Sequence, residues 1–208
     1  MKDASFWDRV APKYVAQPLA DPEAYERTLE RTRHYLKSGD VVVEFGCGSG
    51  STAIKLAPAV SRIVASDISS EMIGFGRERA RSEGRTNVEF EVATPEAAPW
   101  GDASFDAVLA FNLLHLIKAR LAALANMHRL LKPNGLFISK TMCLADANPT
   151  YRVVLPLMQV VGKAPYVAFL SDSELEREIA AAGFEIIERQ HHSSRSKDVR
   201  PFLVARRC

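Results

Sequence analysis

The segment from residue 41 to residue 57 constrains the fold more than any other part of this chain. It begins with a short apolar run that ends in Glu44 and Phe45, and a loop follows with glycines at positions 46, 48 and 50. Residues 51–57 then have the composition of a helix. Because glycine has no Cβ, such a strand, loop and helix let backbone N–H groups approach a ligand closely. The segment therefore predicts an α/β fold that holds a nucleotide-like cofactor.

The glycine spacing and the acidic residue before it favour one class of cofactor. Dinucleotide-binding loops have the pattern G-x-G-x-x-G, whereas this loop has G-x-G-x-G followed by Ser51. A carboxylate at Glu44 would repel a pyrophosphate but would suit a cofactor that carries an ammonium and a sulfonium. Asp67 ends the next apolar run, at roughly the 20-residue spacing at which an acidic side chain accepts hydrogen bonds from ribose hydroxyls. Both classes of cofactor share this feature, so the choice between them depends on the glycine spacing and on Glu44. We therefore expect S-adenosylmethionine as the cofactor.

Length and charge limit the architecture and the partners. A chain of 208 residues, 47% of them hydrophobic, can form one α/β domain with a small cap but not two ordinary domains. The formal net charge is only +2, and the arginines between residues 77 and 85 alternate with glutamates. Such a pattern is typical of a solvated helix face, so no nucleic-acid partner is expected.

Cysteine usage and hydropathy indicate the compartment. Cys47, Cys143 and Cys208 form no C-x-x-C pair, so neither a disulfide framework nor a metal site is expected. The N-terminus is charged where a signal peptide would be apolar. The longest apolar stretch, Val153 to Val161, is far shorter than the roughly 20 residues that span a membrane. We expect a cytoplasmic protein without membrane insertion, and the oligomeric state stays open.

Strand-like and helix-like segments alternate along the chain, which predicts a parallel sheet with helices on both faces. The predicted strands are 41–45, 62–66, 88–92, 105–111, 136–140, 184–190 and 199–206. The predicted helices are 22–36, 52–60, 70–83, 119–131 and 171–182, the last with Ser171 or Asp172 as N-cap. Residues 133–135, Pro-Asn-Gly, are expected to stop a helix before the fifth strand. Residues 144–170 break the alternation.

Four blocks, in this order and spacing, resemble the class I (Rossmann-like) S-adenosylmethionine-dependent methyltransferases. They are Glu44 to Gly50, Asp67 to Met72, Ala98 to Val108 and Leu130 to Leu136. The branch is the small-molecule one, similar to the ubiquinone/menaquinone-biosynthesis methyltransferases, and the segment from Phe6 to Tyr14 resembles its opening. The resemblance implies a doubly wound, mostly parallel seven-stranded sheet with an antiparallel last strand. It also implies methyl transfer to an oxygen, nitrogen or carbon of a small-molecule acceptor.

The resemblance places the cofactor on residues of the first two blocks. It implies that the loop of Gly46, Cys47 and Gly48 lies against the methionyl and ribose portions, and that Glu44 lies near the amino group. Asp67 would bind the ribose hydroxyls, although it could instead cap the following helix.

Four further residues are candidates for cofactor contact. Ile68 or Met72 would flank the adenine, unless they are ordinary core residues. Thr94 stands where the family usually has an Asp that accepts from the adenine amino group, and its hydroxyl can still accept. Asn112 matches the position that lines the methionyl side, and Tyr14 is also counted among the cofactor contacts.

The acceptor side is less defined by sequence. His115 lies where an acceptor would approach, and it could take a proton or could merely pack under the next helix. His191 and His192 are expected to be solvent-exposed rather than metal-binding. Residues 1–38 would form a helical cap on a single domain. Within residues 144–170, Tyr151 to Phe169 would close over the site together with Phe6 to Tyr14, unless both segments only form a second hydrophobic cluster.

Three alternative functions stay open at this point. A protein that binds the cofactor without transferring a methyl group would have the same loop. A nucleic-acid methyltransferase is less favoured, because residues 112–115 read Asn-Leu-Leu-His and lack the Asn/Asp-Pro-Pro-aromatic pattern of amino-methylating enzymes. An NAD-dependent oxidoreductase conflicts with the glycine spacing and with Glu44.

Overall fold

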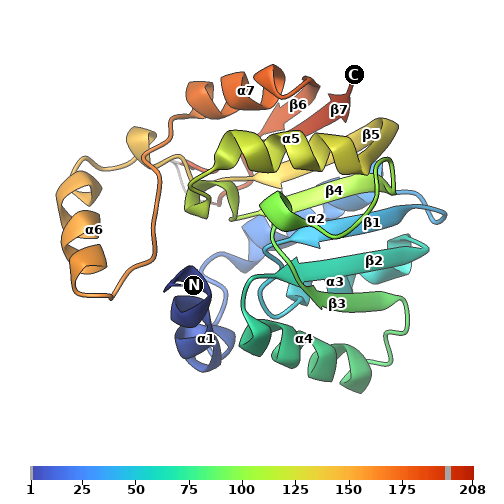
Figure 1. Cartoon of the computed structure of the whole chain (residues 1–208), viewed down its shortest axis with the longest axis horizontal. Helices are drawn as coiled ribbons and strands as arrows, with labels where there is room; N and C mark the ends of the chain where they lie inside the picture. Colours follow the sequence, from blue (N-terminus) through green and yellow to red (C-terminus); the bar gives the residue numbers. More distant parts are fainter. Residues whose placement is uncertain (1, 195–197) are drawn as a thin grey trace.

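The computed structural model describes residues 2–194 and 198–208, and its centre is a seven-stranded sheet (Figure 1). The strands are β1 (Val41–Phe45), β2 (Arg62–Asp67), β3 (Val88–Val92), β4 (Phe105–Phe111), β5 (Leu131–Lys140), β6 (Phe184–Gln190) and β7 (Phe202–Arg207). Their order is β3-β2-β1-β4-β5-β7-β6. The first five strands pair in parallel, whereas β7 is antiparallel to β5 and to β6. The expected doubly wound sheet with an antiparallel last strand is confirmed.

Helices cover both faces of the sheet and bury two hydrophobic cores. One face packs against α2 (Pro22–Tyr35), α3 (Ser51–Leu56) and α4 (Ser70–Ser82), and the other packs against α5 (Arg120–Leu130) and α7 (Asp172–Ala181). Short 3₁₀ turns lie at η1 (Ala57–Ala59), η2 (Pro95–Ala97), η3 (Leu114–Leu116) and η4 (Leu144–Asp146). Because both faces are covered, the central strands are apolar on both sides, which explains their near-continuous hydrophobic sequence.

Two strand boundaries and one cap refine the sequence prediction. β5 begins at Leu131, directly after α5, and not at Leu136. The register jumps from Phe105 opposite Leu131 to Ala107 opposite Leu136, so the Pro-Asn-Gly segment is a bulge inside the strand. β7 begins later than predicted, at Phe202. Ser171 is the N-cap of α7 and forms a capping box with Glu174, which decides between the two expected caps.

Two helices lie outside the sheet layers. α1 (Lys2–Val15) lies beside α4, where Asp8 Oδ1 accepts hydrogen bonds from Ser69 Oγ at 2.7 Å and from the Glu71 N–H at 3.3 Å. α6 (Tyr151–Val160) stands away from the sheet and was not predicted as a helix (Figure 1). It has no buried residue, and most of its apolar side chains are exposed. Within the described residues, no helix has the length and apolar character needed to cross a membrane.

The ring of Phe90 fixes how α4 packs against β3. A Cβ built on Gly76 of α4 would lie 2.3 Å from this ring, whereas a Cβ on Gly74, in the same helix, would meet nothing within 4 Å. Gly76 is therefore required by packing, and Gly74 is not.

We expect opposite effects of the same substitution at these two helical glycines. Gly74→Ala should raise the free energy of unfolding by about 0.5–1 kcal/mol, because alanine loses less backbone entropy on folding. Gly76→Ala should lower it by about 1–3 kcal/mol, because the new methyl group collides with Phe90. Chemical denaturation of both variants measures the difference. Equal effects of the two substitutions would contradict this account of the packing.

Candidate functional site

The predicted site lies at the carboxyl ends of the parallel strands, where the loops after β1, β2 and β4 meet. The helix after β1 packs on one face of the sheet and the helix after β4 packs on the other. In open α/β sheets, the point at which the strand order reverses in this way is where ligands bind. The loop after β1 contains three glycines with left-handed φ angles of 67°, 54° and 72° at positions 46, 48 and 50.

Close packing explains two of these glycines beyond their backbone angles. A Cβ on Gly46 would lie 2.8 Å from the side chain of Leu113, in the loop after β4. A Cβ on Gly50 would lie 2.4 Å from the ring of Phe90. Sequence analysis missed Leu113 and Phe90, because nothing in their local sequence indicates that they pack against a loop so distant in the chain.

Asp67 joins the glycine loop to the end of β2. Its Oδ2 accepts a hydrogen bond from the Gly48 N–H at 2.9 Å, and its Oδ1 accepts from the Ser69 N–H at 2.9 Å. The N-cap of α4 is Ser69, whose side chain accepts from the Met72 N–H. Asp67 is therefore not the cap of this helix. Burial is the main cause that raises the pKa of Asp67, and the carboxylate of Asp8 raises it further.

Glu44 lies beneath the N-terminus of α3 and is only 2% exposed. The N-cap of α3 is Gly50, which has no side chain, and the backbone N–H of Ala53 donates to the Glu44 carboxylate. The other oxygen, Oε2, has no hydrogen-bond partner among the described residues. Burial raises the pKa of Glu44 from 4.5 to about 8, and the charge of Asp67 adds to this. A buried carboxyl group with a free oxygen suits a cationic ligand group.

Tyr14 covers the glycine loop from the end of α1. Its ring lies 3.8 Å from the point that a Cβ on Gly48 would occupy, and it stacks edge-on against Trp7 at 6.2 Å between ring centres. Partial burial and the nearby carboxylate of Asp67 raise the pKa of its hydroxyl, although the residue as a whole is 52% exposed. Asp8 holds α1 in this position through Ser69, a link that sequence analysis missed because the two residues lie far apart in the chain.

The other predicted cofactor residues lie around the same strand ends. The Cys47 N–H donates to the Ser66 carbonyl at 2.9 Å, and the side chain of Cys47 is buried. Ile68 is half-buried, whereas Met72 is 2% exposed, so Ile68 is the better placed of the two to flank an adenine. Thr94 is the N-cap residue of η2, and its hydroxyl makes no cap hydrogen bond. Asn112 has a left-handed φ of 54°, and its N–H donates to the Lys140 carbonyl at 2.7 Å.

His115 lies in η3, directly after β4, and is 8% exposed. Its Nδ1 has no hydrogen-bond partner among the described residues, and its carbonyl accepts from the Ala168 N–H at 2.8 Å. Burial lowers the pKa of its imidazole to about 4, so the ring is neutral at physiological pH. A neutral imidazole can exchange hydrogen bonds with a ligand, but it is a weak proton acceptor.

The sequence prediction was wrong for His192. Its side chain is only 4% exposed, with Nδ1 3.0 Å from Thr28 Oγ1 and Nε2 3.1 Å from Gln190 Oε1. Lys140 Nζ also donates to Thr28 Oγ1, at 3.0 Å, so this buried network ties α2 to the ends of β5 and β6. His191 is exposed as predicted. Within residues 2–194 and 198–208, no group of three or more His, Cys, Asp or Glu side chains could hold a metal ion.

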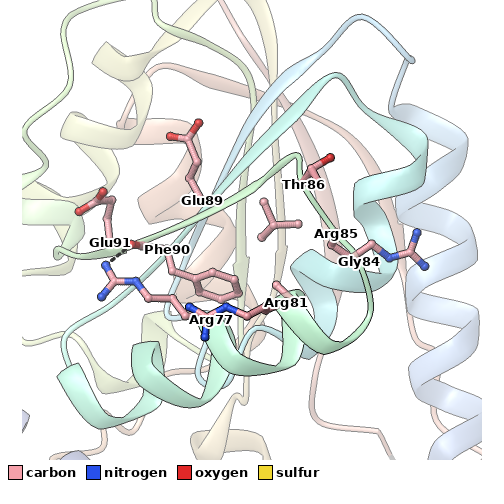
Figure 2. Close-up of a pocket in the computed structure, with 10 residues that line it drawn as sticks. Arg77, Arg81, Gly84, Arg85, Thr86, Glu89, Phe90 and Glu91 are labelled. Carbon is pink, nitrogen blue, oxygen red and sulfur yellow. Dashed lines mark hydrogen bonds between the residues drawn. The ribbon is translucent and has the colours of Figure 1, made fainter.

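A basic groove lies away from the predicted cofactor residues, between α4 and β3 (Figure 2). Arg77, Arg81 and Arg85 line it together with Glu89 and Glu91. Arg77 donates to the Phe90 carbonyl at 2.6 Å, and both acidic residues are exposed. The mixture of charges fits the predicted solvated face.

Comparison with known proteins identifies the family. Residues 36–188 match a family described as a methyltransferase domain. The chain belongs to this methyltransferase family. The match confirms the sequence prediction of a methyltransferase.

Two curated relatives resemble this methyltransferase over most of its length. The 27-O-demethylrifamycin SV methyltransferase of Amycolatopsis mediterranei is 32% identical over 155 residues, which cover 70% of the chain and 57% of the relative. The ubiquinone/menaquinone biosynthesis C-methyltransferase UbiE of Geotalea uraniireducens is 30% identical over 143 residues, which cover 64% and 60%. The chain thus spans less than two thirds of the length of these relatives.

A solved structure supports the fold of this methyltransferase. The putative methyltransferase in a complex with the Trm112 activator of Haloferax volcanii matches with a TM-score of 0.80 and 18% identity, covering 98% of this chain and 96% of that one. At this identity the match concerns the fold alone.

The buried Glu44 predicts how stability depends on pH. Between pH 4.5 and about 8, the folded protein keeps a proton on Glu44 that the unfolded chain has released. The free energy of unfolding should therefore fall as the pH rises through this range. Glu44→Gln should make this fall shallower, and the exposed Glu91→Gln should leave it unchanged. Denaturant titrations of the three proteins without ligand, at several pH values, test this, and identical slopes for wild type and Glu44→Gln would refute it.

Proposed function

We propose that this methyltransferase transfers the methyl group of S-adenosylmethionine to an oxygen, nitrogen or carbon of a small-molecule acceptor. The observation that carries the proposal is the buried Glu44, with its unpartnered carboxylate oxygen next to the glycine loop. The O- and C-methyltransferase names of the two relatives agree with an acceptor of this kind.

The residues present fit this cofactor. Glu44 and Asp67 place two carboxyl groups close to the loop, and the charge of Asp67 helps to keep Glu44 protonated. A ligand with a positive charge would favour the ionised form of both groups. A pyrophosphate would add negative charge at the same place. The N–H of Gly48 is held by Asp67 in this structure, so ribose hydroxyls would join a hydrogen-bonding group that is already formed.

The chain contributes mainly orientation to the reaction. When bound, S-adenosylmethionine supplies a methyl group activated by its sulfonium. Asp67 and the glycine loop would hold the cofactor while the loop after β4 positions the acceptor in line with the methyl group, and such alignment supplies much of the rate in transfers of this kind. Because the pKa of His115 is about 4, its imidazole is neutral and can accept a hydrogen bond from the acceptor.

A cover over the acceptor would exclude water, and α1 and α6 are the candidates. α1 is tethered to α4 by Asp8, to Lys118 by Asp3 at 3.2 Å, and to the end of α6 by Arg9, which donates to the Gly162 carbonyl at 3.0 Å. Most apolar side chains of α6 are exposed, among them Leu157 at 65%. These features support closure of α6 towards α1 when ligands bind.

Asp67→Ala should weaken binding of S-adenosylmethionine and of its demethylated product alike. We expect a loss of about 1–3 kcal/mol, because ribose hydroxyls and the Gly48 N–H would lose a buried acceptor. Isothermal titration calorimetry measures both ligands. Asp102→Ala is the matched control, because Asp102 is an exposed aspartate that pairs with Arg129. Tight NADH binding without binding of S-adenosylmethionine would refute the proposed function.

Hydrogen exchange should reveal the cover. Without ligand, residues 151–169 should exchange fast, and exchange in both 6–14 and 151–169 should slow once cofactor product and acceptor are bound. β1 should be protected throughout, since its residues 42–45 are buried. Full protection of both segments without ligand would show that they are fixed packing elements.

The acceptor itself can be found by a transfer screen. Incubation of the protein with methyl-labelled S-adenosylmethionine and fractionated metabolite extracts should label one class of product. Binding of the cofactor with no labelled product in any fraction would favour a binding protein over an enzyme.

A further inference from the structure

Three polar atoms at the carboxyl ends of β4 and β5 are buried without hydrogen-bond partners among the described residues. They are Nδ1 of His115, Oγ of Ser139 and Oγ1 of Thr141. Ser139 and Thr141 are fully buried, and His115 is 8% exposed. Buried polar groups are nearly always paired, and leaving one unpaired costs stability, so each exception calls for an explanation.

The strand register places Ser139 and Thr141 together on one face of the sheet. Ser139 pairs with Ala110 of β4, and the hydrogen bond from the Asn112 N–H to the Lys140 carbonyl continues the ladder, so Thr141 comes opposite Asn112. Ala110 and Phe137 belong to the core beneath α5 and α7. Because side chains alternate along a strand, Ser139 and Thr141 point to this same face. His115 follows three residues after Asn112, in the loop that leaves β4 towards α5.

A strap of residues 163–170 lies along the same edge. The Ala168 N–H donates to the His115 carbonyl at 2.8 Å, and the Ala145 N–H, just beyond Thr141, donates to the Leu170 carbonyl at 3.1 Å. The Lys118 ammonium lies 5.4 Å from the ring centre of Tyr166. The strap continues α6, so movement of the proposed cover would also move this strap. Ligand access to the three polar atoms would then follow from opening of the cover.

The charge around these atoms limits what they can bind. Burial lowers the pKa of the His115 imidazole, and no charged side chain within the described residues contributes to this shift. Lys118 is paired with Asp3, and Arg120 with Glu178. A charged ligand group would be buried here without a counter-ion, at a high cost, whereas a neutral group could exchange hydrogen bonds with two hydroxyls and a neutral imidazole.

We propose that His115, Ser139 and Thr141 form the polar part of the acceptor subsite and select an uncharged acceptor that carries a hydroxyl or carbonyl group. This inference rests on the proposed function, because it takes the carboxyl ends of β4 and β5 as the acceptor side of the cofactor. The hydroxyls of Ser139 and Thr141 determine specificity by hydrogen bonding, and neither reacts.

Three probes of one shape and different charge test the subsite: benzyl alcohol, benzylamine and benzoate at pH 7.5. Their dissociation constants are measured by saturation-transfer NMR, with and without S-adenosylhomocysteine. The proteins are wild type, Ser139→Ala, Thr141→Val and Ser66→Ala. Ser66 is the matched control, because its hydroxyl is also buried and unpartnered but lies on β2, on the cofactor side.

Wild type should bind benzyl alcohol in preference to both charged probes. Ser139→Ala and Thr141→Val should each weaken this binding by about two- to tenfold, the equivalent of one neutral hydrogen bond. Ser66→Ala should leave it unchanged. The thermal midpoints of the Ser139 and Thr141 variants should equal or exceed that of wild type, since each loses an unpaired hydroxyl, so weaker binding cannot be attributed to unfolding.

Two results would overturn the subsite. One is unchanged benzyl alcohol binding in both strand variants, which would mean that the hydroxyls are internal packing groups or bind only water. The other is equal or tighter binding of benzylamine or benzoate. Failure of the proposed function would give a different result, because S-adenosylhomocysteine would then not bind to wild type. The probe measurements made without S-adenosylhomocysteine would still test the role of the three residues.

Discussion

The position of the site depends on two neighbouring parallel strands whose following helices pack on opposite faces of the sheet. β1 leads into α3 on one face of the sheet, and β4 leads into α5 on the other, so the two segments of the chain separate at the carboxyl edge of the sheet. Apolar side chains on both faces of the sheet fill the two cores, and ligands of open α/β sheets bind at this carboxyl edge. The glycine loop occupies the β1 side of the gap, and Leu113 from the β4 side packs directly onto it. The residues proposed for the cofactor and for the acceptor thus lie on different strands of one sheet.

Local sequence predicted those elements whose hydrophobic pattern is complete within a few residues. β1, β3, β4 and β6 have the predicted bounds, because each is a compact apolar or alternating run between clear stops. β5 starts earlier than predicted because its first residue pairs through a bulge, and a bulge is decided by the partner strand. α6 has helical geometry despite Pro156 in its sequence, and no local signal identified it.

In the candidate site, too, local sequence predicts only what a short segment determines. The glycines, Glu44 and Asp67 could be named because loop, strand end and spacing lie within one short segment. Contacts across the fold could not be named: Asp8 reaches Ser69, and His192 is buried against Thr28, each from a distant part of the chain. A polar turn such as residues 191–194 predicts exposure, but burial of His192 depends on α2 lying over it. The local sequence therefore predicts the glycine loop and the strand ends beside it better than the contacts around them.

The hydrogen bond from Arg77 to the Phe90 carbonyl has a consequence for solubility. β3 is an edge strand, and its outward-facing carbonyls could pair with a strand from another copy of the protein. Arg77 occupies one of them, while Glu89 and Glu91 place like charges along the same strand (Figure 2). A second β3 strand approaching this edge would have to displace a guanidinium and bring carboxylates together. The contact of Arg77 thus disfavours pairing of two copies through this edge of the sheet.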